Sequence, residues 1–237
     1  MSTQSPILQR PEVVYPDCDG QPMSDNTLQF EWISTIKWGL EALFRDDPEV
    51  FVAGDLLWYP VEGDNKTRAA PDAMVAIGRP KGYRGSYKQW EEGGIAPQVV
   101  FEVLSPGNRL GETLRKHRFY EKFGVEEYYI YDPDDGELAG CLRSEGELKP
   151  IPEMPGWVSP RLGVRFELEG EQLRLFEPSG RPFASYMELL RQRDQAEAEV
   201  KQAQQEREQA QQERERERQR ADRLAEQLRA LGIEPES

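Results

Sequence analysis

The fold is decided by residues 98–132, which read QVVFEVLSPGNRLGETLRKHRFYEKFGVEEYYIYD. Residues 98–104 are mostly apolar around one carboxylate, Glu102, and predict a buried strand that ends at the Ser-Pro-Gly that follows. Residues 109–123 predict a helix, because a glycine directly after them supplies a common C-terminal stop. The YYIY run near the end predicts a second strand. A strand, a helix and a strand in succession are typical of an α/β domain.

One helix and two strands are predicted before this stretch. Residues 25–45 predict the helix, for which Ser24 or Asp25 would supply the N-terminal cap. Residues 51–59 and 72–77 predict the two strands, joined by a polar loop. The apolar stripe expected on the helix consists of Leu28, Trp32, Ile36, Leu40 and Phe44.

The chain is predicted to have three parts. Residues 1–24 are rich in Pro, Asp and Gly and predict an extended arm, and residues 25–185 predict the α/β domain. Within that domain residues 138–143 predict a strand and residues 161–177 (RLGVRFELEGEQLRLFE) a hairpin. Residues 186–237 have few large apolar side chains and predict a charged helical tail.

The tail follows a heptad pattern. Apolar side chains occupy the repeat near both ends of the tail, and arginine or glutamate occupies it in the middle. Two structures fit this pattern: a coiled coil that makes a dimer, or a single solvated helix held by Glu/Arg pairs three and four residues apart. The repeat consists of Ala196, Val200, Ala203, Arg207, Ala210, Arg214, Glu217, Ala221, Leu224, Leu228 and Leu231.

Charge and cysteine content narrow the class of protein. Most of the net charge of −14 lies in residues 1–185, whereas DNA-binding proteins usually need cations to displace counterions. The single histidine, His117, excludes any site that needs several imidazoles. Cys18 and Cys141 lack metal-type spacing and are predicted to be free thiols in a reducing compartment. Because no signal-peptide core or membrane-length apolar run is present, a cytoplasmic protein is expected.

Charged side chains in apolar surroundings form the candidate site. Asp72 opens one predicted strand and Glu102 lies within another, where a buried carboxylate is costly unless it faces a cavity or a cation. Lys116 lies four residues from both Glu112 and Tyr120, so these three share one helix face. The pattern predicts that Asp72 and Glu102 hold Mg²⁺ or Mn²⁺. Lys116 would stabilise negative charge on a phosphodiester, with Glu112 as a further ligand.

Each of these residues also has an ordinary structural interpretation. Asp72 follows a proline as a turn aspartate would, and Lys116 alone resembles a solvated helix lysine. Glu112 is as consistent with an exposed helix charge as with a ligand. Tyr120 is expected to pack in the core. His117 lies about 100° round the helix from Lys116 and is expected at the surface.

The order of these motifs resembles the Uma-two family of restriction endonucleases. The resemblance covers roughly residues 25–180 and rests on the PD of residues 71–72, the EVLSP of residues 102–106, the K-x-x-x-Y of the helix and the GVEEYYIYDP after it. It implies a restriction-endonuclease-like PD-(D/E)XK core, in which helices flank a mixed sheet, and a magnesium-dependent site that cleaves DNA. Asp72 and Glu102 match the two metal-binding acids of the family.

The active-site lysine expected from this resemblance is not at the position that is usual in the superfamily. In the wider superfamily the lysine lies two positions after the second acid, where this chain has Leu104. In the Uma-two family it typically lies on the next helix, where Lys116 stands. The resemblance therefore implies that Lys116 supplies the lysine of the site.

A long basic loop between the two acids is a candidate nucleic-acid surface. Cations beside flat rings suit a phosphate backbone and unstacked bases. Glu91 and Glu92 follow at once, so an ordinary surface loop is an equal alternative. The candidate residues are Arg79, Lys81, Arg84 and Lys88, interleaved with Tyr83, Tyr87 and Trp90.

The sequence thus predicts a divalent-metal-dependent endonuclease that hydrolyses DNA phosphodiester bonds. Dimerisation through the tail is expected, since a duplex cutter needs one active site for each strand. Two alternatives stay open. One is a weak or inactive nuclease-fold protein that oligomerises through its coiled coil, which the acidic body favours. The other is a metal-dependent hydrolase of small phosphate substrates, which a closed pocket would favour.

Overall fold

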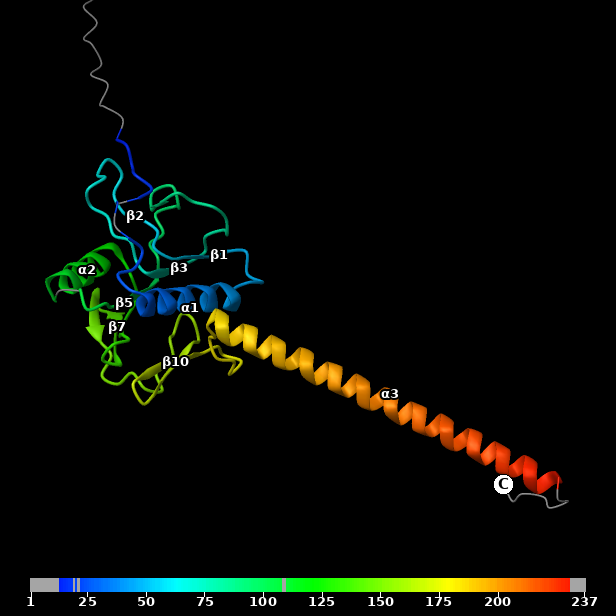
Figure 1. Cartoon of the computed structure of the whole chain (residues 1–237). Helices are drawn as coiled ribbons and strands as arrows, with labels where there is room; N and C mark the ends of the chain where they lie inside the picture. The colour runs from blue at the N-terminus through cyan, green and yellow to red at the C-terminus, as the bar shows by residue number, and fades with distance from the viewer. Residues whose placement is uncertain (1–12, 19, 21, 108–109, 231–237) are drawn as a thin grey trace, which may run out of the picture. The chain divides into compact units, whose positions relative to one another are not determined.

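The computed structural model describes residues 13–18, 20, 22–107 and 110–230 (Figure 1). The chain divides into two compact units at Ser185. The described strands all belong to the first unit, and the described part of the second is one helix, α3 (Tyr186–Ala230). No helix within these described stretches has both the length and the apolar character needed to cross a membrane.

A six-stranded mixed sheet forms the centre of the first unit. Its strands are β1 (Val50–Ala53), β3 (Ala73–Ile77), β5 (Val99–Val103), β6 (Glu127–Asp132), β7 (Glu137–Ser144) and β8 (Glu147–Pro150). They lie in the order β1-β3-β5-β6-β7-β8. β5 and β6 run parallel and are joined by the crossover helix α2 (Leu110–Phe123), as a parallel pair requires, while each other neighbouring pair is antiparallel.

Two small sheets accompany this core. β9 (Arg165–Glu169) and β10 (Gln172–Phe176) form an antiparallel hairpin, which confirms the one predicted over residues 161–177. β2 (Trp58–Tyr59) and β4 (Tyr87–Lys88) pair in parallel.

The alternation of side chains gives the large sheet two buried faces. The odd-numbered residues of β5 pack with α1 (Thr27–Leu43) and the β9–β10 hairpin. The even-numbered Val100 and Glu102 lie on the other face, which α2 covers. The predicted α/β fold, a mixed sheet flanked by helices and followed by a long C-terminal helix, is confirmed.

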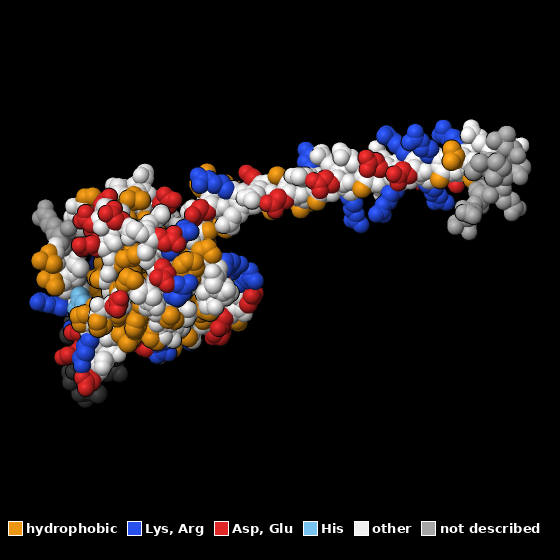
Figure 2. Space-filling view, turned by 90° about the horizontal axis from the view of Figure 1, so that it is seen from below, with side chains coloured by type: hydrophobic (Ala, Val, Ile, Leu, Met, Phe, Trp, Pro, Cys, Tyr) orange, Lys and Arg blue, Asp and Glu red, His pale blue; other side chains and the backbone are white. Residues whose placement is uncertain are grey.

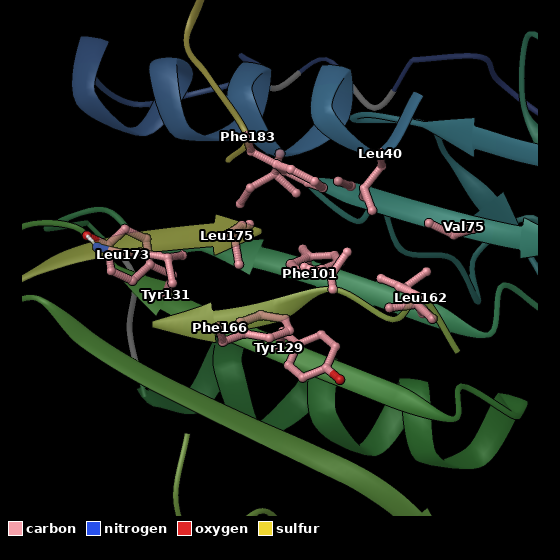
Figure 3. Packing of buried hydrophobic residues seen from close by; sticks show 14 of the residues in the cluster. Leu40, Val75, Phe101, Tyr129, Tyr131, Leu162, Phe166, Leu173, Leu175 and Phe183 are labelled. Atoms are coloured by element: carbon pink, nitrogen blue, oxygen red, sulfur yellow. Dashed lines mark hydrogen bonds between the residues drawn. The ribbon is translucent and has the colours of Figure 1, made fainter. Parts of the chain in front are cut away.

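The α1 side of the core contains a close contact between a ring and a glycine. Phe183 follows β10 and lies beside Leu40 of α1 (Figure 3). A Cβ built at Gly39 would come within 2.2 Å of the Phe183 ring. Gly39 therefore leaves the space that this ring needs against the helix.

Helix α1 differs from its prediction in its cap and its buried face. The cap is Asn26, whose side chain accepts a hydrogen bond from the Gln29 N–H at 2.8 Å, so the prediction of Ser24 or Asp25 was wrong. Steps of four residues drift about 40° round a helix each time, so the predicted stripe is only partly buried. Leu28 is exposed, Trp32 and Phe44 pack against the core half-buried, and Ile36 and Leu40 are in the core. The buried residues follow a 4-3-4 spacing: Gln29, Ile33, Ile36 and Leu40.

The single strand predicted over residues 51–59 is wrong, because β1 and β2 belong to different sheets. Asp55 between them has a φ of 48°, in the left-handed region that a strand cannot continue through. β4 and β8 were not predicted. β4 has two residues and β8 buries only Leu148, so neither contains an apolar run that would mark it.

Helix α3 is continuous over 45 residues, about 65–70 Å at the rise of an α-helix. Two apolar side chains of the heptad repeat are exposed, with Val200 68% and Leu224 59% accessible. Polar side chains bond along it at a spacing of four, as Gln202 does with Glu206 at 2.9 Å. Arginines gather toward its C-terminal end (Figure 2). Because a coiled coil and a solvated single helix share this geometry, both interpretations of the tail stay open.

Part of the predicted arm contacts the loop between β2 and β3 within the first unit. Residues 13–18 form neither helix nor strand. The Tyr59 hydroxyl donates to the Pro16 carbonyl at 2.7 Å, and Asn65 Nδ2 donates to the Val14 carbonyl at 2.8 Å. The arm thus ties down the loop between β2 and β3. The boundaries of arm, domain and tail stay predictions.

Candidate functional site

A cavity of about 540 Å³ lies beside the first predicted acid. Three parts of the first unit form its wall: the start of α2, the loop that leads into β3, and the segment before α1. Asp72, Glu112 and Lys116 line the cavity. Glu102 is buried behind them at 3% exposure and reaches the wall through Lys116. The structure therefore brings the four predicted catalytic residues together.

Strand pairing places the two acids side by side. Ala73 of β3 pairs with Phe101 of the antiparallel β5, so Asp72 and Glu102 come next in the same register and share one face. In addition to burial, the charge of the Glu102 carboxylate acts on Asp72 and contributes to its raised pKa. At this point Asp72 Oδ2 accepts the N–H of Val103 at 2.7 Å, where the regular ladder of the two strands has ended. The backbone of β5 thus fixes the first acid.

Helix α2 contributes two donors to the second acid. Lys116 Nζ donates to Glu102 Oε2 at 2.6 Å, and the Tyr120 hydroxyl donates to Oε1. Lys116 and Tyr120 are four residues apart and lie on one helix face, as the sequence predicts. Tyr120 also packs in the core against Tyr128, so packing alone does not describe its position.

The electrostatics of the cluster are those of two carboxyl groups that share one ammonium. Burial and the neighbouring Glu102 carboxylate raise the pKa of Asp72 well above its usual range, against the opposing effects of Lys116 and the Val103 N–H. Burial lowers the pKa of Lys116, but the charges of Glu102 and Asp72 outweigh burial, so the net shift is upward. Lys116 is therefore charged at neutral pH, and the cluster lacks one positive charge.

These donors fit a hard divalent cation. Mg²⁺ takes oxygen ligands, commonly one or two carboxylates with several waters, and Mn²⁺ prefers the same donors. Within the described part of the chain, no group of three or more His, Cys, Asp or Glu side chains is arranged as a metal site. Asp72 faces the cavity from beside Glu102, and Glu112 lines the same cavity. A cation there would offset the crowding of carboxyl groups that raises the pKa of Asp72.

His117 occupies a position near the cluster without joining it. Its ring centroid lies 6.1 Å from that of Tyr128, and it is half-buried, not fully at the surface as expected. It is not among the described residues that line the cavity.

The four cations of the basic loop are each paired with a carboxylate. None of them is among the described lining residues of the cavity. This geometry is that of an ordinary surface loop, and their role in DNA binding stays a prediction. The pairs are Arg79–Glu92, Arg84–Glu92, Lys81–Glu41 and Lys88–Glu91, with N···O distances of 4.0, 2.5, 3.1 and 3.3 Å.

Sequence reasoning missed the residues that support the cluster. Gln29 Nε2 donates to the Val103 carbonyl at 2.7 Å, so two side chains hold both backbone groups of Val103. Ser105 Oγ donates to Asp25 Oδ2 at 2.6 Å beside the cavity. No sequence pattern identifies Gln29 as a supporting residue, because its role depends on how α1 packs on β5. Arg68 and Arg115 also line the cavity and were not predicted.

The family model described as "Putative restriction endonuclease" (Uma2) matches residues 15–175, more than half of the 237-residue chain. The chain belongs to the Uma2 family. This match contains both acids and helix α2, and it confirms the resemblance drawn from the motifs. The restriction-endonuclease-like fold class that follows from it is confirmed as well.

Solved structures similar to this Uma2 chain include a protein from Anabaena variabilis ATCC 29413 that is described as a "putative nuclease belonging to DUF820". The two share 18% sequence identity with a TM-score of 0.43 over 57% of this chain and 72% of the other. No curated protein matches the chain.

Proposed function

We propose that this Uma2 protein is a cytoplasmic endonuclease that needs a divalent metal to hydrolyse DNA phosphodiester bonds. The observation that carries the proposal is the cluster of Asp72, Glu102 and Lys116, of which Asp72 and Lys116 line the cavity and Glu102 is buried behind them. Two acids and a charged lysine in one place supply the groups that phosphodiester hydrolysis needs, in a chain from a nuclease family.

Each residue has a defined role in this proposal. Asp72 and Glu102 provide carboxylates for Mg²⁺ or Mn²⁺, and Glu112 assists from the cavity wall. A cation bound there lowers the pKa of a water and offsets the negative charge that develops on the phosphate. Lys116 keeps its ammonium charged beside the acids and stabilises charge on the scissile phosphate. Tyr120 holds the orientation of Glu102 through its hydroxyl.

Dimerisation through α3 belongs to the same proposal. Val200 and Leu224 occupy the heptad repeat and are exposed, so a second α3 would cover them. A dimer would provide one active site for each strand of a duplex.

The test combines metal binding with cleavage. Mg²⁺ and Mn²⁺ are titrated calorimetrically into the wild type and into Asp72→Asn, Glu102→Gln and Lys116→Met, and cleavage of supercoiled plasmid is followed in the same samples. We expect both acid variants to lose metal binding. All three variants should cleave about 10²–10³-fold more slowly, as when one transition-state donor is removed. Asp135→Asn, an exposed acid in a turn, is the control that should change neither quantity.

The other outcomes separate the alternatives. Metal binding without plasmid cleavage, together with hydrolysis of a small phosphodiester, would assign the site to small phosphate substrates. A wild type that binds no metal and cleaves nothing would overturn the nuclease proposal in favour of an interaction protein with a nuclease fold.

A further inference from the structure

We propose that Arg68 and Arg115 bind backbone phosphates of the DNA substrate at the cavity, and that the basic loop of Arg79–Lys88 does not. This inference rests on the proposed nuclease function and names the residues that hold the substrate. Both arginines line the same cavity as Asp72 and Lys116.

The first observation is the pairing state of the cations. Lys116 is engaged with Glu102 at 2.6 Å. Neither Arg68 nor Arg115 forms an ion pair with any residue in the described stretches. All four cations of the basic loop form ion pairs. A phosphate would have to displace a carboxylate from each loop cation, whereas the two cavity arginines present their charge without that cost.

The second observation is that Arg68 is held in place by neutral groups. Its Nη1 lies 3.3 Å from the carbonyl of Asn65 and 3.5 Å from the hydroxyl of Tyr59. Tyr59 is fully buried and bonds to Pro16. The guanidinium is therefore positioned by a loop that the N-terminal arm ties down, with its full charge and most of its donors left for a ligand.

Arg115 occupies the complementary position on α2. It is exposed and directly precedes Lys116, so it lies on the solvent side of the same helix turn. Arg68 and Arg115 come from different parts of the cavity wall, one from the loop before β3 and the other from α2. A phosphodiester backbone bound in the cavity near Asp72 would be within the same lining as both guanidinium groups.

The charge of the cavity makes DNA binding by the two arginines depend on a divalent cation. Among its described lining residues, four are acids (Asp25, Asp55, Asp72 and Glu112) and three are cations (Arg68, Arg115 and Lys116). An excess of carboxylates repels a polyanion, and a divalent cation held by the acids reverses that balance. The contribution of Arg68 and Arg115 to DNA binding is therefore expected in the presence of a divalent cation and not in EDTA.

The test measures binding of a short fluorescein-labelled DNA duplex by anisotropy, at several salt concentrations, with the full chain. It is carried out in Ca²⁺, which takes oxygen ligands, and in EDTA. Arg68→Gln and Arg115→Gln should each raise Kd about tenfold in Ca²⁺, the effect of losing one charged hydrogen bond. Each should also reduce the slope of log K against log salt by about one phosphate contact.

Matched variants guard against loss of the fold. Arg118→Gln removes an exposed arginine of the same helix that is not among the described lining residues, and it should leave Kd and slope unchanged. Arg68→Lys keeps the charge and should keep most of the salt slope while losing part of the affinity, because lysine cannot form a bidentate pair. Melting temperatures are recorded for every variant.

The results separate this inference from the function on which it rests. Normal DNA binding by Arg68→Gln and Arg115→Gln would overturn the inference even if the wild type cleaves plasmid, as would a wild type that binds no duplex. Weaker binding by Arg79→Gln and Lys88→Gln alone would assign DNA to the basic loop instead. Arginine-dependent binding without plasmid cleavage by the wild type would support the phosphate site and overturn the nuclease function.

Discussion

Val103 joins the acid cluster to the helix on the opposite face of the sheet. Its N–H donates to Asp72 on one side, and its carbonyl accepts from Gln29 of α1 on the other. These bonds satisfy the backbone of β5 where its ladder with β3 has ended. The first acid is thus part of the structure of the strand end as well as a candidate ligand.

Asp72→Asn tests the charge at this position without a metal, in EDTA. Burial and Glu102 raise the pKa of Asp72, so its contribution to stability is complete below its ordinary pKa of about 4 and is lost as pH rises through the raised pKa. Asparagine keeps an acceptor for Val103 and carries no charge. We expect the variant to melt at a higher temperature than the wild type at pH 8, with the gap closing toward acid pH in calorimetric scans. A lower melting temperature for the variant at every pH would contradict the claim that the charge of Asp72 lacks a compensating partner.

Tyr120→Phe tests the hydrogen bond that orients Glu102. The ring would keep its contacts with Trp58 and Tyr128, while a buried carboxylate would lose one donor. We expect the free energy of unfolding to fall by about 1–3 kcal/mol in urea titrations. The control is Tyr87→Phe, an equally buried tyrosine whose hydroxyl donates to the neutral carbonyl of Ile95 and which should lose less. Equal losses of unfolding free energy in the two variants would show that the bond from Tyr120 to Glu102 contributes no more than a bond to a neutral carbonyl.

The acids could be predicted because their signals are local, and the supporting residues could not. A carboxylate inside an apolar strand and a lysine on the next helix are visible within residues 98–132. Gln29 and Arg68 lie far from that stretch and reach the site only because α1 and the β2–β3 loop pack there. In the basic loop the sequence shows the cations but not their partners, and Lys81 pairs with Glu41, forty residues away.

Among the elements, helix α2, the central strands and the β9–β10 hairpin were predicted well, whereas β4 and the edge strand β8 were not predicted. Helix α2 and strands β3, β5 and β6 agree with the sequence patterns, because each is covered on its apolar side and carries a clear stop. The break between β1 and β2 depends on the positive φ of Asp55, which a run of apolar letters does not show.

Gly39→Ala tests the packing of α1. Alanine favours a helix over glycine by about 1 kcal/mol, but a Cβ at this position would overlap the ring of Phe183. We expect a net loss of about 1–3 kcal/mol in stability, as for overpacked cores. The matched control is Gly111→Ala in α2, where a built Cβ has no heavy atom within 4 Å and the change should be neutral or stabilising. The packing argument fails if both alanines stabilise the protein in urea titrations.

For the whole molecule, the open question is what α3 does with its heptad repeat. Arginine or glutamate in the middle of the repeat weakens a coiled coil, while apolar residues near its ends favour one. The sequence shows both features, and the free energy of association decides between a dimer and a single helix.

Sedimentation of the full chain over a range of concentrations tests the proposed dimer. Replacing Val200 and Leu224 together by glutamine removes two apolar side chains from the repeat and should raise the dissociation constant tenfold or more, at about 1.5–3 kcal/mol for each side chain buried. Ala198→Gln, on the side of α3 away from the repeat, should leave the constant unchanged. A wild type that stays monomeric at every concentration would identify α3 as a solvated single helix.

The bonds of the N-terminal arm bear on how this chain is handled in the laboratory. Val14 and Pro16 hold Asn65 and Tyr59, and those two residues in turn contact the guanidinium of Arg68. Trimming the gene to the first helix, a routine step before crystallisation, would delete these anchors and free the loop. A protein shortened in that way should still fold and crystallise. Its measured affinity for DNA should be lower than that of the full chain. Purification tags are better placed ahead of residue 1 than in exchange for the arm.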